Sequence, residues 1–589
     1  MNSTSPLFTL THIVLPSSDS LEYDELLVRR QENKLYFNTW MNVFAAQKYA
    51  QYCDLGEIYF SLTARGAYRL EIIGSKRETD KAPVDDVLVS TELHDDACVH
   101  IPNATAYEGL YFSIIQNPAE PVNLISGTWC TDKAPQRQNK LAIVSCTFKK
   151  EEYITRNVAI YEQFLKETPE IQNRIKLFVV DNGKTLPDSI KSDNVELYYN
   201  MNAGGAGGFT RGLMEVRKRN EGYTRVLFMD DDVEVFPESF YRTLIMADYL
   251  KPAYKQAFIN GAMLDLYEKA QFFENQAYRW GMWTRAVHPP CEMTYENILK
   301  VNNIPEDIFH RPLQQTHGAW WYCCFDIEIV NNKGLPLPLF LRGDDLEWGW
   351  RNYGQIHITM NGICIWHAPF QYRVSKTADF YYLPRNMFLL NILYTSDFHQ
   401  WWKADFTNTL KYLCRTYNYT GLALFEMALL DILKGDKAFR ENPEDQLKRI
   451  NKANELSCVK QCTDEEELQK AMSPRPYKIK KWRRVVSRFT KRGKYCPNIF
   501  KKKERSIPDW LPPVEAFTMV KNVNLYNPLK KQYEIRQFDF AKDKKYSQSI
   551  SQLINQIEKK FDELSATLNT AHRELTSEGF WKQYLELEN

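Results

Sequence analysis

The chain lacks long hydrophobic runs, although 44% of its 589 residues are hydrophobic. A helix that crosses a membrane needs about 20 consecutive apolar residues. No segment reaches that length, so no membrane-spanning helix is expected. The first residues, MNSTSPLFTLTHIVLP, also lack the basic and long apolar regions of a secretory signal. These absences predict a chain that stays in the cytoplasm.

An excess of charge of one sign is missing as well. The 75 Lys and Arg residues and the 74 Asp and Glu residues leave a formal net charge of +1. This balance excludes a globally basic nucleic-acid-binding protein, and no nucleic-acid partner is expected, although a local basic patch remains compatible with it. The 12 cysteines form no paired CxxC clusters. A four-ligand zinc site is therefore not expected, and buried reduced thiols are the preferred interpretation.

The length and the changes in sequence pattern along the chain predict three domains, because 589 residues are too many for one compact core. Residues 1–136 contain short stretches such as 57–74 and 109–116, in which apolar and polar residues alternate, and this predicts a β-sandwich of jelly-roll type. Residues 137–375 alternate apolar strands with helical stretches, which predicts an α/β fold with a mostly parallel sheet. Residues 376–589 are predicted to form a helical domain.

Polar side chains follow the apolar runs of the central domain, where parallel sheets bind ligands. One run ends at Thr147, another at Asp181, and a third at three consecutive aspartates, 230–232. Side chains alternate along an extended backbone, so Asp230 and Asp232 are expected on the same side. There they could bind one Mg²⁺ or Mn²⁺, since hard cations prefer carboxylate oxygens. A solvated turn is the alternative.

Glycine is concentrated in NAGGAGGF, residues 202–209. Four glycines in five residues allow the backbone to approach a bound group closely. A helix is expected to begin near Phe209, where its free N–H groups would face a phosphate. The pattern is neither a Walker loop nor a Rossmann fingerprint, and it gains weight only from the strand-end acids on either side.

The stretch LRGDDLEWGWR, 341–351, places Asp344 and Asp345 near an expected helix start. Adjacent acids and partial burial raise a carboxyl pKa toward neutrality, as a general base requires. An N-terminal helix cap is the alternative, and both roles can coexist.

Two further motifs contain aromatic or imidazole side chains. Trp320 and Trp321 could stack on a sugar face, although core packing is equally compatible with their spacing. His367, in CIWHAPF, ends an apolar run. Most single histidines are structural, but this one could complete a hard metal site that suits Mn²⁺ as well as Mg²⁺.

In this order the motifs resemble those of a known enzyme family. A Thr-Phe strand end, an Asp strand end, NAGGAGG, DDD, WW, GDDLEW and WHAPF together are similar to inverting GT-A glycosyltransferases, specifically the polymerising galactofuranosyltransferases of mycobacteria. The resemblance covers most of the chain. It implies a central Rossmann-like GT-A domain, an N-terminal β-sandwich and a C-terminal helical domain.

The resemblance also implies roles for individual residues. The metal, Mn²⁺ or Mg²⁺, would bind Asp230, Asp232 and His367. Asp345 would be the catalytic base, and its neighbour Asp344 would hold sugar hydroxyls. Family members tend to carry Asn-Arg after the Thr-Phe pair, whereas this chain has Lys149-Lys150, so Lys150 would neutralise phosphate as a point charge rather than as a fork. The implied nucleotide-sugar site comprises Thr147, Phe148, Lys150, Asp181, Asn202, Gly204, Gly205, Asp230, Asp231, Trp320 and Trp321.

The function implied by the resemblance is metal-dependent transfer of galactofuranose from UDP-galactofuranose to a hydroxyl of a galactose-containing, polyprenyl-linked glycan, with inversion. YYLPRN, residues 381–386, is also similar to the family and would line the acceptor side. Two alternatives stay open: a transferase for another nucleotide sugar, such as a rhamnosyl or galactopyranosyl donor, and a glycan-binding module without catalysis. Homo-oligomerisation is also left open.

A basic segment, 470–503, contains no acidic residue. Trp482, Val485, Val486 and Phe489 recur within it at helical spacing among Lys and Arg, which is typical of an amphipathic helix on an anionic membrane surface. A solvated basic face or an RNA-binding patch is the alternative. A lipid-linked acceptor favours the membrane, so peripheral attachment to the inner face of the cell membrane is expected.

Overall fold

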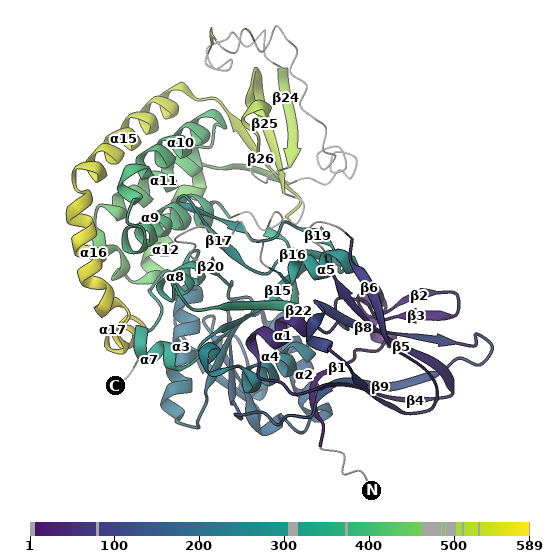
Figure 1. Ribbon diagram of the computed structural model, residues 1–589. Coiled ribbons are helices and arrows are strands. Elements are labelled where there is room, and N and C mark those ends of the chain that lie inside the picture. The colour runs from purple at the N-terminus through teal and green to yellow at the C-terminus, as the bar shows by residue number, and fades with distance from the viewer. Residues whose placement is uncertain are drawn as a thin grey trace.

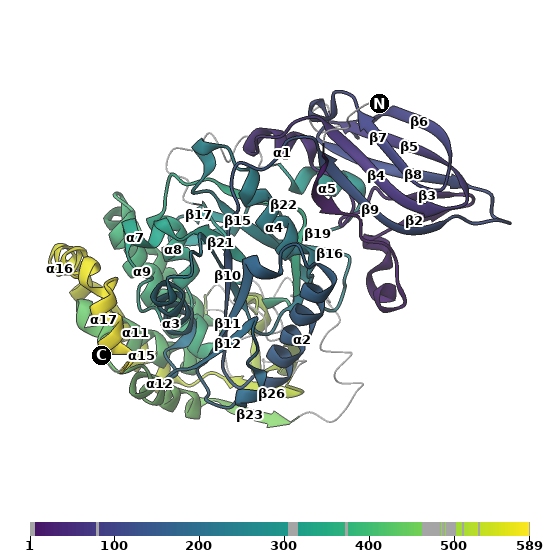
Figure 2. The same cartoon turned by 90° about the horizontal axis from the view of Figure 1, so that it is seen from below.

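The structure is a computed structural model that describes residues 6–77, 82–303, 316–370, 375–461, 485, 489–490, 502–508, 512–527 and 530–587. Figures 1 and 2 show the N-terminal strands on one side of the molecule and the C-terminal helices on the other. The central sheet lies between them. This order follows the chain, so each part is built mainly from consecutive residues.

Two antiparallel sheets form the N-terminal part, in the strand orders β1-β9-β4-β7 and β2-β3-β8-β5-β6. Buried and less buried residues alternate along β4, as its sequence predicts. Phe60 of β4 packs against Phe112 of β8 and Trp129 of β9, so the inward faces of the two sheets share a core. The elements are β1 (Phe8–His12), β2 (Arg29–Gln31), β3 (Lys34–Tyr36), α1 (Ala46–Tyr52), β4 (Ile58–Arg65), β5 (Ala67–Lys76), β6 (Val84–His94), β7 (Ala97–Ile101), β8 (Gly109–Gln116) and β9 (Asn123–Thr131).

The central sheet has ten strands, with β12-β11-β10-β13-β21-β15-β16-β19 along its main path and β14 and β22 beside it. Its first four strands in this order are parallel to one another. Beyond β13 most pairs are antiparallel. The short connection from β15 to β16 allows only that direction. The strands are β10 (Leu141–Thr147), β11 (Ile175–Asp181), β12 (Val195–Tyr199), β13 (Arg225–Asp230), β14 (Glu234–Val235), β15 (Phe258–Asp265), β16 (Gln271–Glu274), β19 (Cys291–Glu292), β21 (Cys323–Asp326) and β22 (His357–His367).

The two faces of this sheet belong to different cores. Ile143 and Leu227 face a core that includes α2, α4 and the N-terminal sheets. Val144 and Phe228 face a core that includes α3 and the C-terminal helices. Burial on both faces explains why the strands read as continuous apolar runs. The neighbouring elements are α2 (Glu151–Glu167), α3 (Gly204–Arg219), α4 (Glu238–Tyr249), β17 (Ala277–Trp280), β18 (Trp283–Ala286), α5 (Tyr295–Val301), β20 (Thr316–His317), α7 (Glu328–Lys333) and α8 (Asp344–Arg351).

The C-terminal part is mainly helical, as predicted, but it also contains a four-stranded sheet, β23-β26-β25-β24, which the sequence interpretation missed. The helices are η7 (Ala378–Tyr382), α9 (Leu383–Tyr394), α10 (Trp402–Arg415), α11 (Tyr419–Ile432), α12 (Pro443–Asn451), α15 (Phe540–Lys559), α16 (Phe561–Leu575) and α17 (Glu578–Tyr584). The strands are β23 (Cys458–Gln461), β24 (Lys502–Pro508), β25 (Val520–Asn527) and β26 (Gln532–Gln537).

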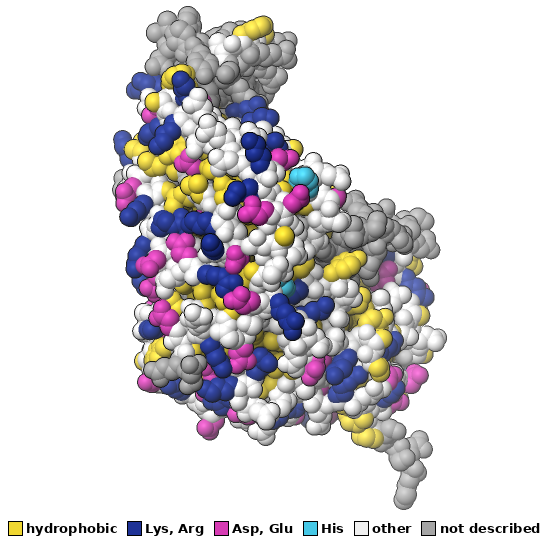
Figure 3. Space-filling view, turned by 90° about the vertical axis from the view of Figure 1, so that its left-hand side faces the viewer, with side chains coloured by type: hydrophobic (Ala, Val, Ile, Leu, Met, Phe, Trp, Pro, Cys, Tyr) yellow, Lys and Arg dark blue, Asp and Glu magenta, His cyan; other side chains and the backbone are white. Residues whose placement is uncertain are grey.

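Within the described ranges, no helix is both long enough and apolar enough to cross a membrane. On the face shown in Figure 3, basic and acidic side chains are interspersed over the C-terminal helices. The predicted membrane-facing segment, 470–503, lies outside the described residues except for positions 485, 489, 490, 502 and 503. Its interaction with lipid stays a prediction.

Candidate active site

The strand ends of the parallel sheet bring the predicted polar residues to one edge. In the strand register, Thr147 pairs with Asp181, and Cys146 pairs with Asp230. These pairs lie at the carboxyl ends of β10, β11 and β13. Ligands of such sheets bind at this edge, so the candidate site is where the sequence places it.

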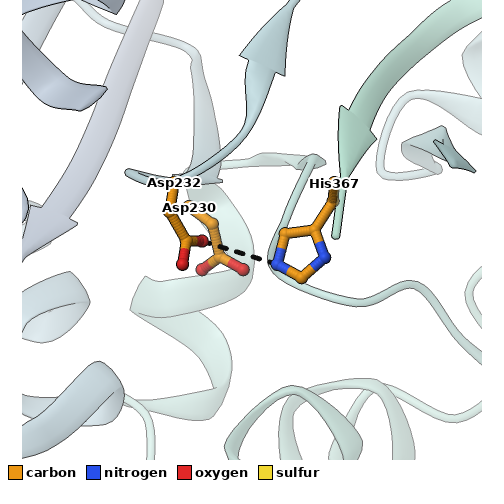
Figure 4. A group of neighbouring side chains, drawn as sticks. All are labelled: Asp230, Asp232 and His367. Atoms are coloured by element: carbon orange, nitrogen blue, oxygen red, sulfur yellow. Dashed lines mark ion pairs between the residues drawn. The ribbon is translucent and has the colours of Figure 1, made fainter. Parts of the chain in front are cut away.

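Two carboxylates and an imidazole meet at the end of β13. The short strand β14 follows the aspartates and pairs with the last residues of strand β22. This pairing holds His367, the final residue of β22, beside the aspartates. Ligand atoms of Asp230, Asp232 and His367 lie within 4.8 Å of one another. His367 Nε2 is 3.4 Å from Asp232 Oδ1, and the three side chains point toward one another in Figure 4. This donor set fits Mn²⁺ or Mg²⁺.

Asp231 points away from the other two aspartates. Its carboxylate interacts with the Thr147 hydroxyl and the Phe148 N–H, which lower its pKa. Burial and the charge of Asp232 outweigh them and raise the pKa of Asp231 to about 6. Asp231 therefore joins the ends of β10 and β13 rather than completing the metal group.

Lys150 supplies the positive charge nearest to this group among the predicted site residues. Its Nζ lies 3.7 Å from Asp232 Oδ2. Phe148, two residues earlier, has a side chain that is 42% exposed, so its ring is accessible to a ligand. Both residues lie at the strand-end edge of the sheet, and their binding of a nucleotide sugar stays a prediction.

Asp181 has a different local task from the one expected. It is fully buried, and its two carboxylate oxygens accept the N–H groups of Gly183, Thr185 and Leu186 at 2.8, 2.6 and 2.8 Å. Asp181 therefore shapes the loop after β11. Any contribution to nucleotide binding passes through that loop.

The glycine-rich stretch is helical rather than a loop. Helix α3 begins at Gly204, five residues before the predicted start at Phe209. A Cβ added at Gly208 would lie 1.9 Å from Cys146 Sγ, so this glycine lets α3 pack directly on β10. The expectation failed because glycine disfavours helices in isolation, whereas here close packing outweighs propensity.

The first residues of α3 lie against the predicted catalytic acids. The Gly205 N–H donates to the Phe340 carbonyl at 3.0 Å, and the Gly204 N–H donates to Asn202 Oδ1 at 3.3 Å. A Cβ at Gly205 would lie 2.9 Å from Asp344 Oδ2. Glycine at 205 therefore makes room for the Asp344 carboxylate beside the positive end of α3.

Asp344 and Asp345 open α8 as a half-buried acid pair. Asp345 Oδ1 accepts the Leu346 N–H at 2.8 Å. Burial raises the pKa of Asp345 to about 6, against the nearby Arg342 cation. Burial, the Asp345 charge and the Asp230 charge raise the pKa of Asp344 well above its usual range. Of the two carboxyl groups, Asp344 therefore holds its proton the more strongly.

Glu347, the third acid of the motif, is a structural residue. It is fully buried, and its carboxylate accepts hydrogen bonds from Arg351 Nε at 2.8 Å and from the Tyr394 hydroxyl at 2.5 Å. Burial by itself raises the pKa of Glu347, but its interactions with Arg351, His572 and Tyr394 outweigh burial and lower this pKa to about 2. Glu347 anchors α8 and does not take part in the acid pair.

Both tryptophans of the pair are buried, in different core clusters. Trp320 is buried, with its ring 5.2 Å from Phe209 and 4.9 Å from Phe228, so core packing accounts for it. Trp321 donates through Nε1 to the Gly261 carbonyl at 3.0 Å. Its ring lies 6.0 Å from Phe370, whose ring is 5.9 Å from His367.

Two charged residues near the acid pair were missed by the sequence interpretation. Glu274, at the end of β16, has a pKa raised to about 7, first by burial and then by the Asp345 charge. Arg342 lowers the pKa of Asp345 and contacts Asp379 at 3.3 Å. Glu274 ends an ordinary hairpin strand with no local motif, so only its tertiary position relates it to the site.

Two curated relatives are similar to this chain, both described as "Galactofuranosyltransferase GlfT2". The one from Mycolicibacterium smegmatis is 26% identical over 358 residues, which cover 57% of this chain and 54% of the relative. The one from Mycobacterium tuberculosis is 27% identical over 368 residues, with the same 57% and 54% coverage. The chain therefore spans about half the length of the curated relatives it matches.

Comparisons with family models and with solved structures do not identify a family for this chain. No model of a known protein family matches the chain. Among solved structures, xylanase 10B of Clostridium thermocellum matches with a TM-score of 0.14 and 10% identity, covering 28% of this chain and 32% of the xylanase chain. The two curated matches confirm that this chain resembles the galactofuranosyltransferases GlfT2.

Proposed function

We propose that this chain is an inverting, metal-dependent glycosyltransferase with a GT-A catalytic domain, which transfers galactofuranose from UDP-galactofuranose to a hydroxyl of a galactose-containing glycan. One observation carries the proposal: ligand atoms of Asp230, Asp232 and His367 gather within 4.8 Å of one another, near enough to the half-buried acid pair that the Asp230 charge raises the pKa of Asp344. The similarity to GlfT2 supports the choice of sugar.

On the donor side, Asp230, Asp232 and His367 would hold Mn²⁺ or Mg²⁺. When bound, the cation supplies charge neutralisation for a leaving diphosphate. Lys150 adds a positive charge on the same side, 3.7 Å from Asp232. The beginning of α3 contributes its dipole at the acid pair, where Gly205 borders Asp344.

On the acceptor side, Asp345 removes the proton from the acceptor hydroxyl. The oxygen then attacks the anomeric carbon from the face opposite the diphosphate, the bond to UDP breaks, and the configuration inverts. A pKa of about 6 leaves Asp345 mostly ionised at neutral pH, which a base requires. Asp344 keeps its proton and can donate a hydrogen bond to a sugar hydroxyl.

Three parts of the proposal rest on the sequence alone. A polyprenyl-linked acceptor, attachment to the inner face of the membrane through 470–503, and the three-domain division remain predictions. They are compatible with a chain whose described helices include none suited to crossing a membrane.

The proposal is tested by product analysis with UDP-galactofuranose, Mn²⁺ and a panel of galactose-containing acceptors. Turnover should need the metal and should rise with pH through about 6, as Asp345 loses its proton. Asp345→Asn should still bind UDP but lose turnover by about 100-fold or more, because general-base catalysis contributes 10²–10⁴-fold. Asp344→Asn should lose less turnover than Asp345→Asn, because the amide of asparagine can still donate a hydrogen bond to a sugar hydroxyl.

Each competing interpretation has its own result in the same assay. If the protein transferred sugar only from a rhamnosyl or galactopyranosyl donor, the proposed mechanism would stand and only the assigned sugar would change. Glycan binding without transfer from any donor would indicate a binding module. Wild-type turnover in purified Asp345→Asn would exclude Asp345 as the base.

A further inference from the structure

The loop before the acid pair has an unfavourable backbone conformation. Arg342 and Gly343 have φ values of +66° and +85°, so two consecutive residues occupy the left-handed region. Glycine accepts this region, but a side chain such as that of Arg342 makes it costly. Such a conformation persists only when its surroundings impose it. The contacts of loop 341–343 therefore identify what places Asp344 and Asp345.

Asn386 of α9 makes the contacts that hold this loop. Its side chain is fully buried, and its Nδ2 donates to the carbonyls of Leu341 at 3.0 Å and Arg342 at 2.6 Å. A Cβ added at Gly343 would lie 3.4 Å from Asn386 Cβ. Both amide hydrogens of Asn386 are thus used on Leu341 and Arg342, the first two residues of this loop.

The orientation of the Asn386 amide is itself determined by a buried network. Arg385 Nε donates to Asn386 Oδ1 at 2.9 Å. Arg385 Nη1 reaches the Tyr381 hydroxyl and Gln446 Oε1, each at 3.2 Å, and Tyr381 donates to Asp431. These residues come from η7, α9, α11 and α12. The C-terminal helices therefore determine which way the amide faces.

We propose that Asn386 is a positioning residue of the transferase: it holds loop 341–343 so that Asp345 and Arg342 keep their relative places. This inference rests on the proposed function for its kinetic consequence, but not for its structural one. YYLPRN was expected to line the acceptor side. That role stays a prediction, and the last residue of the stretch, Asn386, contacts the backbone that precedes the catalytic acids.

The charges around Asp345 decide how displacement of the loop would be detected. Asp344 and Arg342 lie on its own segment, Glu274 faces it from β16, and Cys323 faces it from β21. Arg342 is the one cation among these four. Displacing it removes the group that favours ionised Asp345, so the acidic limb of the pH profile moves to higher pH.

The chain offers a matched control on the same helix. Asn391 is also fully buried, and its Nδ2 donates to the carbonyls of Met387 at 2.7 Å and Met282 at 3.3 Å. It does not contact loop 341–343. Asn386→Ala and Asn391→Ala remove the same amide group from the same helix, but only Asn386→Ala removes hydrogen bonds to the loop.

The experiment compares the two variants in full-length protein by hydrogen exchange, kinetics and melting. Asn386→Ala should speed amide exchange across 341–350, whereas Asn391→Ala should not. The kcat of Asn386→Ala should fall by about 10- to 100-fold, because small misplacements of catalytic groups have effects of this size. The pH profile should shift as described. Asn386→Ser, which keeps one donor, should be intermediate, and it replaces the alanine variant if that variant does not fold.

The outcomes separate the two proposals. Equal rates of amide exchange across residues 341–350 in both variants, or an unchanged kcat in Asn386→Ala, would overturn the role of Asn386. Either result would leave the proposed transferase function standing. A wild-type chain that transfers no sugar would remove the proposed function, and exchange would still decide whether Asn386 holds the loop.

Discussion

At the residue scale, three consecutive aspartates differ because their side chains face different partners. Alternation along an extended backbone predicted that Asp230 and Asp232 would share a side, and the structure places both beside His367. Asp231 faces the end of β10 instead. The position of His367 could not be derived from local sequence, because the pairing of β14 with β22 brings it there.

Metal binding is the property that tests this arrangement at single residues. His367→Ala removes one ligand, so the Mn²⁺ concentration for half-saturation should rise by about 10-fold or more. Lys150→Ala should change it in the opposite direction, because removal of a cation 3.7 Å from Asp232 lessens repulsion of the metal. Titration followed by manganese paramagnetic resonance measures both constants. Equal affinity in all three proteins would contradict the proposed ligand set.

At the scale of single elements, helix α3 shows how packing overrides local preference. A sequence with four glycines in five residues was expected to precede the helix, but the helix includes all four, and Gly208 lies where it meets β10. Gly212 repeats the contact one turn later, where an added Cβ would lie 2.3 Å from Val144 Cγ1. The length of the helix could therefore not be predicted without its partner strand.

Substitution of helical glycines tests this packing. Gly208→Ala should lower the free energy of unfolding by roughly 1–3 kcal/mol, because overpacking of a core has that cost. Gly579→Ala in α17 is the control, since the nearest heavy atom to its added Cβ is 4.0 Å away. Its stability should stay equal or rise slightly, as alanine favours helices. Denaturant unfolding measures both, and a neutral Gly208→Ala would contradict the close contact.

At the scale of the whole molecule, α8 connects the catalytic acids to the C-terminal helices. Glu347 of α8 accepts from Tyr394 of α9, and the same hydroxyl lies 2.9 Å from His572 Nε2 of α16. Arg351 completes the contact with a buried ion pair. The helix that bears the acid pair is thus held by Tyr394 of α9 and, through it, by His572, which lies more than 200 positions away along the chain.

The pH dependence of stability tests this connection. The pKa of Glu347 is about 2 in the fold, below the unfolded value of about 4.3. Its contribution is therefore fully present above about pH 4.3 and is lost as the pH falls toward 2. Glu347→Gln should lower stability at pH 7 by about 3–5 kcal/mol, as expected for a broken buried pair.

A comparison across pH distinguishes this effect from general acid unfolding. The difference between wild type and Glu347→Gln should narrow below about pH 4.3, where the unfolded carboxyl takes up its proton. Glu574→Gln is the matched control, because Glu574 pairs with Arg440 at an exposed position. Its melting temperature should be nearly unchanged, since exposed pairs contribute little. A constant difference across pH would exclude the buried ion pair as the cause.

The sequence by itself determined the strand ends, the alternation that pairs Asp230 with Asp232, and the order of motifs that resembles galactofuranosyltransferases. The strand ends and the alternation depend on neighbours a few residues apart, and the order of motifs is read directly along the chain. Tertiary structure alone decided that the glycines are helical, that Glu274 faces Asp345, and that Asn386 holds the loop before the acid pair. The reason is physical: pairing, burial and charge act between segments whose distance in space the local sequence does not encode.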